Sequence, residues 1–227
     1  MNKLLLMASA LALASCASGP APSLQSGPDA EVTYDGLVRI DNSRFKVAYA
    51  DPEIKFSEYK KIMGGGAAFE FRAVPKVSTL TARRSNAKEF WISDADRQKL
   101  QDSVTEVFRE EIAKAQGWEF VEEPGPDVLM IRGVLLDIVS FVPPDIIGRG
   151  EIYLTRFGEA TLVLEAVDSM SGEVVYRGIE RSTVETAGDM LQLANTVTTW
   201  AEVRRWARRY GTIIREGLEY IRQQDAG

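Results

Sequence analysis

The sequence predicts an α+β fold, in which a single domain is built from a mixed or antiparallel sheet with two main helices packed against it. The first observation is the order of the segments, which runs strand, helix, strand, hairpin, helix. The second is size, because 227 residues, 45% of them hydrophobic, can bury a sizeable core without disulfides. The third is a change of composition that separates residues 1–30 from the expected domain at 31–227.

Residues 1–15 have the layout of a secretory signal peptide. Lys3 gives a positive start, Leu4–Leu13 is apolar except for Ser9, and small residues follow. Ten residues rise only about 15 Å as a helix, which is too short for a hydrocarbon core of about 30 Å. We therefore expect a secretion signal and not a membrane span.

Cys16 is the one cysteine of the chain, and it follows Leu13-Ala14-Ser15. This order resembles the lipobox of bacterial lipoproteins. The resemblance implies cleavage before Cys16 and a membrane anchor made of lipid attached to that residue. Ala17 replaces the aspartate that tends to retain such proteins at the inner membrane, so we expect the outer membrane, with the domain facing the periplasm. An ordinary signal peptide with an incidental cysteine is the alternative.

Residues 16–30 are expected to form the lipidated, flexible tether. Their Ala, Ser, Gly and Pro residues show no hydrophobic period and bury too little apolar surface to order themselves. The ends of about fourteen such residues typically lie about 20 Å apart.

Structure is expected to begin near Tyr34, and Tyr59–Met63 is the first candidate strand. Gly64–Gly66 is interpreted as a flexible turn, because the GK[ST] of a phosphate-binding loop does not follow it. Phe69–Arg72 alternates apolar and polar residues, as a half-buried strand does.

The clearest helix is predicted from Ser93 to Ala115. Ser93 is a favourable N-cap, and Gly117 is expected to cap the other end. Apolar residues recur at helical spacing and form one stripe. They are Leu100, Val104, Val107, Phe108, Ile112 and Ala115.

Val128–Phe141 is almost continuously apolar, which predicts a central strand covered on both faces, with Gly133 as a bulge. Ala160–Val167 and Glu173–Thr183 follow as a predicted β-hairpin, because a short glycine-containing turn separates them.

The closing helix is predicted from Thr199 to Arg222. Its wide apolar face places Trp206 and Tyr210 in the core. Gly211 and Gly217 each disfavour a helix by about 1 kcal/mol relative to alanine. We expect a close approach of this helix to the sheet to compensate.

Composition excludes several classes of function. The chain has no histidine, which rules out histidine-based catalysis and histidine-based zinc chemistry, and one cysteine cannot make a multi-cysteine zinc site. Without Lys3 the mature chain has 26 basic and 33 acidic side chains, a formal charge of −7, which argues against nucleic-acid binding. We expect no cofactor, no metal site and no catalytic residue.

A candidate anionic-partner patch lies on the closing helix. It consists of Arg204, Arg205, Arg208 and Arg209. The patch would suit peptidoglycan carboxylates, lipid phosphates or an acidic protein face. A solvated face neutralised by Glu202 and other acids is the alternative.

Four carboxylates lie in or near predicted strands: Asp137, Glu151, Glu159 and Glu165. A convergent pair could act as general acid and base, whereas solvent-facing strand positions explain them without chemistry. Trp200, near the start of the closing helix, is either a sugar-stacking platform or a core residue.

Three stretches resemble the DUF3313 family of bacterial lipoproteins. They are Tyr34–Val38, residues Tyr49–Lys61, and the hairpin turn with Asp168, Ser171, Gly172 and Glu173. The pattern is also similar to penicillin-binding-protein activator lipoproteins, the curli secretion lipoprotein and the amino-terminal domain of TolB. The resemblance implies a periplasmic fold and transfers no functional residue.

The expected function is binding, to an envelope protein or to peptidoglycan, by a domain held on the outer membrane. A subunit of an oligomeric secretion or transport complex is the second interpretation, and a hydrolase that uses only carboxylates is the third. The sequence does not indicate an oligomeric state.

Overall fold

The computed structural model describes residues 20–76, 88–143 and 151–225. The main-sheet strands are β1 (Ser23–Leu24), β2 (Val38–Asp41), β3 (Val47–Ala50), β4 (Lys61–Phe71), β5 (Glu119–Phe120), β6 (Val128–Ser140), β8 (Arg156–Asp168) and β9 (Val174–Glu185). The other elements are β7 (Tyr153–Leu154), β10 (Gln192–Leu193), the short 3₁₀ helices Phe56–Glu58 and Ala187–Asp189, and the long helices α2 (Asp94–Ile112) and α3 (Thr196–Asp225).

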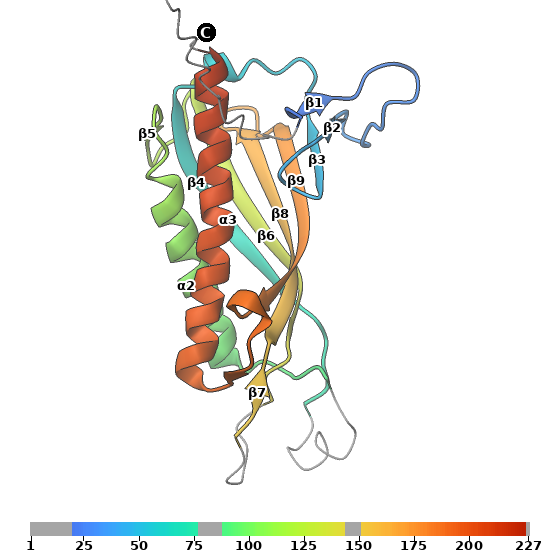
Figure 1. Cartoon of the computed structure of the whole chain (residues 1–227). Helices are drawn as coiled ribbons and strands as arrows, with labels where there is room; N and C mark the ends of the chain where they lie inside the picture. Colours follow the sequence, from blue (N-terminus) through green and yellow to red (C-terminus); the bar gives the residue numbers. More distant parts are fainter. Residues whose placement is uncertain (1–19, 77–87, 144–150, 226–227) are drawn as a thin grey trace, which may run out of the picture.

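The eight main strands form one sheet in the order β1-β2-β3-β9-β8-β6-β4-β5, and β7 pairs with β10. β6 is parallel to β4 and antiparallel to β8, so the sheet is mixed. α2 and α3 lie side by side along one face of it (Figure 1). The predicted α+β domain with two main helices is therefore confirmed.

The core lies between the two helices and the sheet. Leu129, Ile131 and Leu135 of β6 are buried in it, and they alternate with half-buried residues of the opposite face. The prediction that β6 is covered on both faces is wrong, because the long helices pack on one face only. Its apolar run reflects a central position in the sheet.

The bulge of β6 lies at Asp137 and Ile138, and not at Gly133 as predicted. Leu136 pairs with Thr161 and Val139 with Glu159, so one residue of β8 faces two of β6. Asp137 has a φ of 55°, in the left-handed region that Asp tolerates better than most residues.

Gly64–Gly66 lies inside β4, so the predicted turn is wrong and the two candidate strands on either side of it are one strand. Gly64 pairs with Ile131 of β6, and pairing on both sides of the glycines holds this segment in the strand despite its low strand propensity. The register shifts between Gly64 and Ala67, which marks a bulge. Gly65 packs closely against β6, since a Cβ there would lie 2.6 Å from Cγ of Met130 and that side chain would have to shift.

The predicted helices are confirmed with small shifts at their ends. Ser93 caps α2, and its Oγ accepts a hydrogen bond from the Asp96 N–H at 3.1 Å. α3 begins at Thr196, where Asn195 Oδ1 accepts from the Thr198 N–H at 3.0 Å. Gly117 follows α2 with a φ of 79°, as expected of a residue that ends a helix.

Gly211 allows α3 to approach α2, and not the sheet as predicted. A Cβ on Gly211 would lie 2.8 Å from Cβ of Glu111, whereas one on Gly217 would have no neighbour within 4 Å. Trp206 and Tyr210 are buried as predicted, and Trp206 Nε1 donates to Ser182 Oγ of β9 at 2.9 Å.

Part of the expected tether lies against the sheet. Ser23 and Leu24 pair with Asp41 and Ile40 of β2, and Gln25 Nε2 donates to Asp41 Oδ1 at 2.9 Å. Cys16 and the expected signal peptide lie outside the described residues. No helix in the described parts of the chain is long and apolar enough to cross a membrane.

Candidate functional site

The outer edge of β4 is open over most of its length. Only Lys61 and Ile62 pair with β5, and the Ile62 carbonyl accepts from the Val121 N–H at 2.9 Å. From Met63 to Phe71 no described residue pairs with the outer side of β4. Its backbone donors and acceptors on that side therefore have no strand partner among the described residues.

The residues of this open edge are unusually small. Gly64–Ala68 are all exposed, and none carries a charge or a large side chain. Natural proteins usually protect a sheet edge with lysine, proline, a bulge or a covering element. Here the protection is limited to the bulge at Gly65 and Gly66, so the edge stays accessible on both sides of it.

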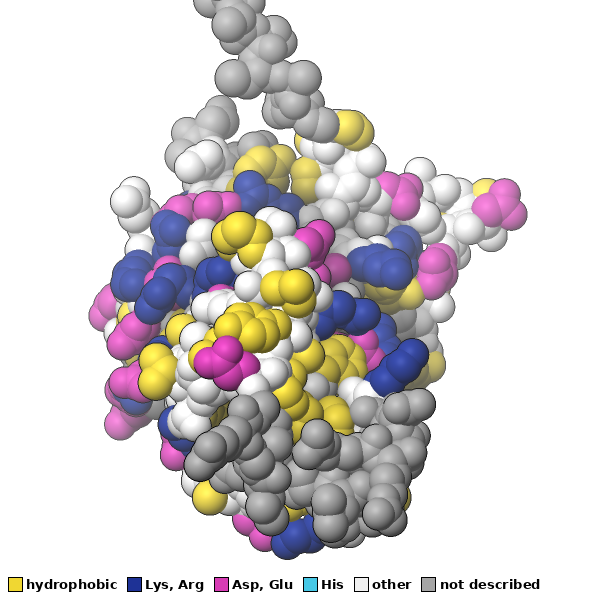
Figure 2. Space-filling model, turned by 60° about the horizontal axis from the view of Figure 1, so that its bottom comes forward, with side chains coloured by type: hydrophobic (Ala, Val, Ile, Leu, Met, Phe, Trp, Pro, Cys, Tyr) yellow, Lys and Arg dark blue, Asp and Glu magenta, His cyan; other side chains and the backbone are white. Residues whose placement is uncertain are grey.

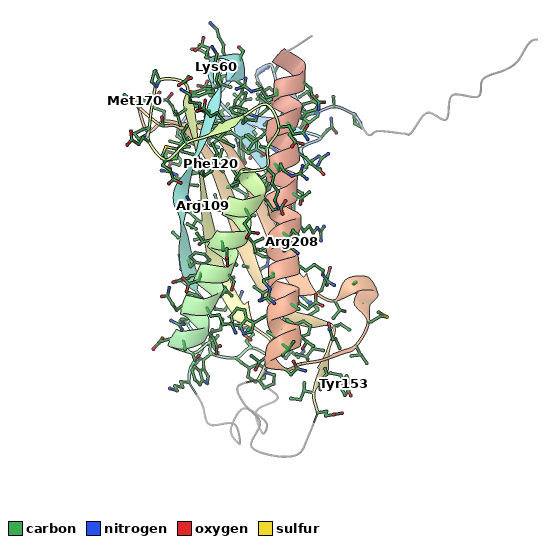
Figure 3. All side chains as sticks on the ribbon, turned by 90° about the vertical axis from the view of Figure 1, so that its left-hand side faces the viewer. Lys60, Arg109, Phe120, Tyr153, Met170 and Arg208 are labelled. Atoms are coloured by element: carbon green, nitrogen blue, oxygen red, sulfur yellow. The ribbon has the colours of Figure 1, made fainter. Side chains whose placement is uncertain are left out.

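A groove of about 820 Å³ runs between β4 and α2. Figure 3 shows this side of the molecule, with α2 in front of the sheet and Arg109 toward the upper end of α2. β4 contributes Ala67 and Phe69, and α2 contributes the polar wall. The wall residues are Gln98, Gln101, Asp102, Thr105, Glu106, Arg109 and Glu110.

An apolar pocket of about 220 Å³ adjoins the groove, between α2 and the sheet. Gly64, Gly66 and Ala67 lie along it, and because their side chains are absent or a single methyl group, it is accessible from the edge of β4. Its apolar lining comes from α2, β5, β6 and β8. The lining includes Phe108, Ile112, Phe120, Ile131, Leu135 and Leu164.

The wall of the groove is acidic. Asp102, Glu106 and Glu110 recur every four residues and so share one side of α2. Glu106 and Glu110 make no ion pair with any described residue, whereas Arg109 is paired with Glu122. Within the described residues, the groove thus combines backbone groups without a strand partner, an apolar pocket and acidic side chains without an ion pair.

The predicted arginine patch is exposed on α3, and its charge is partly neutralised. Its members are Arg204, Arg205, Arg208 and Arg209. Arg205 pairs with Glu202, and Nε of Arg208 lies 3.9 Å from Oε1 of Glu111. Arg204 has no ion-pair partner among the described residues. The structure therefore brings the four together without showing what they bind.

Two of the candidate acid–base carboxylates, Asp137 and Glu159, are brought together by arginines. Arg72 and Arg181 each lie within ion-pair distance of both acids. The Arg72 guanidinium lowers the pKa of Asp137, which keeps this carboxylate ionised. A general acid needs the opposite shift, so the geometry favours an ion-pair network.

The other two carboxylates are separate. Glu165 accepts from Arg132 at 2.7 Å and from Arg177 at 2.8 Å, while Glu151 accepts from the Tyr153 hydroxyl at 2.9 Å. Strand alternation could have placed Arg132 and Glu165 on one face, but their pairing depends on the register between β6 and β8.

Trp200 is not an exposed platform. Its side chain is buried in the core, and Nζ of Lys99 lies 4.5 Å from its ring centroid. Stacking with a sugar would require displacement of that lysine and exposure of the ring. The core interpretation is therefore correct.

Sequence reasoning missed the open edge and the pocket. The run of small residues was the available signal, and it was assigned to a turn. The absence of a partner strand beyond Ile62 is a property of the whole sheet, which no local pattern contains.

Solved structures show distant similarity to the chain. A PelC dodecamer from Paraburkholderia phytofirmans is 8% identical, covering 74% of this chain and 94% of its own, with a TM-score of 0.33. Protein XCC0632 from Xanthomonas campestris, family DUF330, is 12% identical, covering 78% and 93%, with a TM-score of 0.40. A homolog of the neuraminyllactose-binding hemagglutinin from Helicobacter pylori is 10% identical, covering 76% and 95%, with a TM-score of 0.38.

These TM-scores lie below 0.5, so the similarities carry no conclusion about function. The comparison with curated proteins gives no match. A family model matches residues 25–212, which is most of the domain and includes the edge strand and the groove. The chain therefore belongs to the family described as "Protein of unknown function (DUF3313)".

Proposed function

We propose that this chain is an outer-membrane lipoprotein, held through lipid on Cys16, whose periplasmic domain binds an extended segment of an envelope protein. The observation that carries the proposal is the open outer edge of β4 beside an apolar pocket. The protein acts by binding, and no catalytic step is assigned to it.

The physical basis is the addition of a strand. An extended peptide beside β4 would take up the backbone donors and acceptors that β5 leaves unpaired beyond Ile62. Alternate side chains of such a peptide point to the same face, so one in two can enter the pocket under α2. The main chain supplies affinity and the pocket supplies selectivity.

The groove also indicates the chemistry of the partner. Its pocket is lined by Phe108, Phe120 and Leu135, which favours an aromatic or large aliphatic side chain. Its wall carries Glu106 and Glu110, which make no ion pair within the part of the chain that the structure describes, and this favours lysine or arginine beside that anchor. We therefore expect an extended segment in which apolar and basic residues alternate.

Binding is tested with two sets of ten-residue synthetic peptides, in which an aromatic residue alternates with either lysine or glutamate. Fluorescence anisotropy should show tighter binding of the lysine peptides to the purified domain. Ala67→Lys adds a charge at the exposed edge and should abolish binding, whereas Ala73→Lys, beyond the end of β4, should not. Equal affinity for both peptide sets, or equal effects of the two substitutions, would contradict this site.

The anchor needs its own test. Globomycin, an inhibitor of the lipoprotein signal peptidase, should make the unprocessed precursor accumulate, and Cys16→Ala should release the protein from the outer-membrane fraction. If the Cys16→Ala protein is still processed and still sediments with membranes, the proposed lipid anchor at Cys16 is wrong.

A second candidate function is a subunit of an oligomeric envelope complex, in which the open edge of β4 pairs with another copy of the chain. The same open edge supports it, because two copies could each supply the other's missing strand. Sedimentation of the domain without its lipid distinguishes the two, since a monomer at high concentration excludes self-pairing.

A further inference from the structure

Little chain separates Cys16 from the described domain. Pro20 is the first described residue, and β1 begins at Ser23. Four residue steps span at most about 14 Å, even when fully extended. Lipid on Cys16 would therefore hold the β1–β2 edge of the sheet close to the membrane surface, at a much shorter distance than the expected tether of residues 16–30 allows.

Exposed apolar side chains gather near this edge. Leu24 is 41% exposed, Val32 is 55% exposed and Tyr34 is 96% exposed. Leu24 lies opposite Ile40 and Val32 lies opposite Val38, so both flank the same strand, β2. Their positions along β2 differ by two residues, or about 7 Å. We call Leu24, Val32 and Tyr34 the tether-end surface.

The tether-end surface lies at one end of the elongated domain. Val38 of β2 pairs with Ala50 of β3, which pairs with Tyr176 near the start of β9. The turn that carries Tyr34 directly precedes Val38, so it lies at the end of the sheet that also carries the β8–β9 turn. Figure 1 shows β1 and β2 at this end, together with the C-terminal end of α3.

Two of the acidic groups beside the tether-end surface, Asp35 and Glu31, are paired. Asp35 lies 2.7 Å from Arg177, and Glu31 accepts a hydrogen bond from the Tyr49 hydroxyl at 2.5 Å. Paired carboxylates are less costly to bring towards a low-dielectric boundary than free ones. Electrostatic repulsion from these two acids is therefore reduced where the apolar side chains protrude.

We propose that the tether-end surface contacts the lipid interface, so that the domain is held with this end on the bilayer and its other end away from it. The proposal rests on the lipid at Cys16 that the proposed function includes. Leucine and valine would bury apolar area at the boundary between headgroups and acyl chains. Tyrosine suits the same boundary, because its ring is apolar and its hydroxyl remains hydrated.

The opposite end is also apolar but lies farther from Cys16. Tyr153, Met190, Leu191 and Val197 are exposed there, and Figure 2 shows hydrophobic side chains gathered on that end. Figure 3 shows Tyr153 and Met170 at opposite ends of the domain. β8 alone has thirteen residues and spans about 43 Å. With a connection of about 14 Å from Cys16, that far end can meet the same bilayer only if the whole domain lies flat on it.

The test uses a fluorophore attached to a single introduced cysteine. Cys16 carries lipid on its sulfur in the mature protein, so Tyr34→Cys creates one free thiol at the tether-end surface. Val197→Cys is the matched control, because Val197 is 77% exposed at the opposite end. Each lipidated protein is labelled with a polarity-sensitive dye and placed in phosphatidylethanolamine–phosphatidylglycerol vesicles that contain brominated lipids.

Brominated lipids should quench the dye at position 34 and leave the dye at position 197 unquenched. Quenching at neither position, with the protein still floating with the vesicles, would overturn the orientation and leave the anchor intact. Equal quenching at both positions would also overturn the orientation. Protein that fails to float with the vesicles would contradict the lipid anchor at Cys16, and the proposed orientation, which depends on that anchor, would then also be wrong.

Discussion

Glu165 accepts a hydrogen bond from Arg177 Nε at 2.8 Å, across β8 and β9, on the sheet face that the long helices leave uncovered. Its other carboxylate oxygen accepts from Arg132 of β6 at 2.7 Å. Glu165 is only 8% exposed, so one nearly buried carboxylate links three neighbouring strands. Arg177 extends the chain of contacts to Asp35 in the segment before β2.

Glu165→Gln is expected to destabilise the domain by about 2 kcal/mol, because it weakens hydrogen bonds between a buried group and two charged partners. Urea denaturation followed by circular dichroism measures the free energy of unfolding. Glu216→Gln is the control, since its pair with Arg44 is largely exposed and should contribute less than about 0.5 kcal/mol. A similar decrease in the free energy of unfolding in both variants would mean that the hydrogen bonds of Glu165 stabilise the fold no more than a surface ion pair does.

Acid should destabilise the protein partly through Asp168. The backbone N–H of Ser171 lowers the pKa of this carboxyl, and so do the hydroxyl of Tyr59 and the N–H of Met170. A pKa that is lower in the folded than in the unfolded state stabilises the fold above the unfolded value, about 3.9. This contribution is lost as the pH falls through the folded pKa.

We therefore expect the free energy of unfolding to fall between about pH 5 and pH 2, as linkage requires for such acids. Asp168→Asn should flatten this dependence, because asparagine can keep the turn but not the charge. Asp29→Asn, at an exposed position, should leave the dependence unchanged. If the Asp168→Asn protein keeps the wild-type dependence of unfolding free energy on pH, other carboxylates cause the loss of stability in acid.

Asp137 combines a charge pair with an unusual backbone conformation. Its φ of 55° disfavours most side chains, and its carboxylate pairs with Arg72. Asparagine also tolerates the left-handed region, so Asp137→Asn should remove only the charge pair with Arg72. Asp137→Ala should remove the charge pair and also place a side chain that disfavours this φ. Thermal unfolding should show a larger loss for alanine, by about 1 kcal/mol. Equal losses would mean that the bulge relaxes without strain.

Strong local patterns made much of the fold predictable. The helix capped by Ser93, the strand from Val128 and the hairpin around Asp168 each combine hydrophobic periodicity with a clear end signal. The strand at Gly64–Gly66 was not predictable in this way, because it depends on the pairing of Gly64 and Ala67 with β6 on either side of the bulge and not on the strand propensity of glycine.

The candidate binding site was less accessible to sequence reasoning than the core. Its pocket combines Phe108, Phe120 and Leu135, which come from three elements whose contact depends on how α2 crosses the sheet edge. Its open edge depends on β5 ending at Phe120. Binary patterns identify which residues are buried, but they do not identify which backbone groups lack a partner.

Gly211 and Gly217 provide the sharpest test of helix packing, because the same substitution should have opposite effects at the two positions. Gly217→Ala adds a methyl group in open space and should stabilise the protein by up to about 1 kcal/mol through helix propensity. Gly211→Ala places Cβ 2.8 Å from Glu111, so α2 and α3 must separate.

Overpacking of this kind typically costs about 1–3 kcal/mol, so the gain in helix propensity at Gly211 should be cancelled or exceeded. Urea denaturation of the two variants under one set of conditions gives the comparison directly. Because both changes remove the same glycine flexibility from the unfolded chain, the difference between them reports the contact between the helices. Stabilisation by both substitutions would show that α3 can move away from Glu111 at little cost, and that the close approach is not required for the fold.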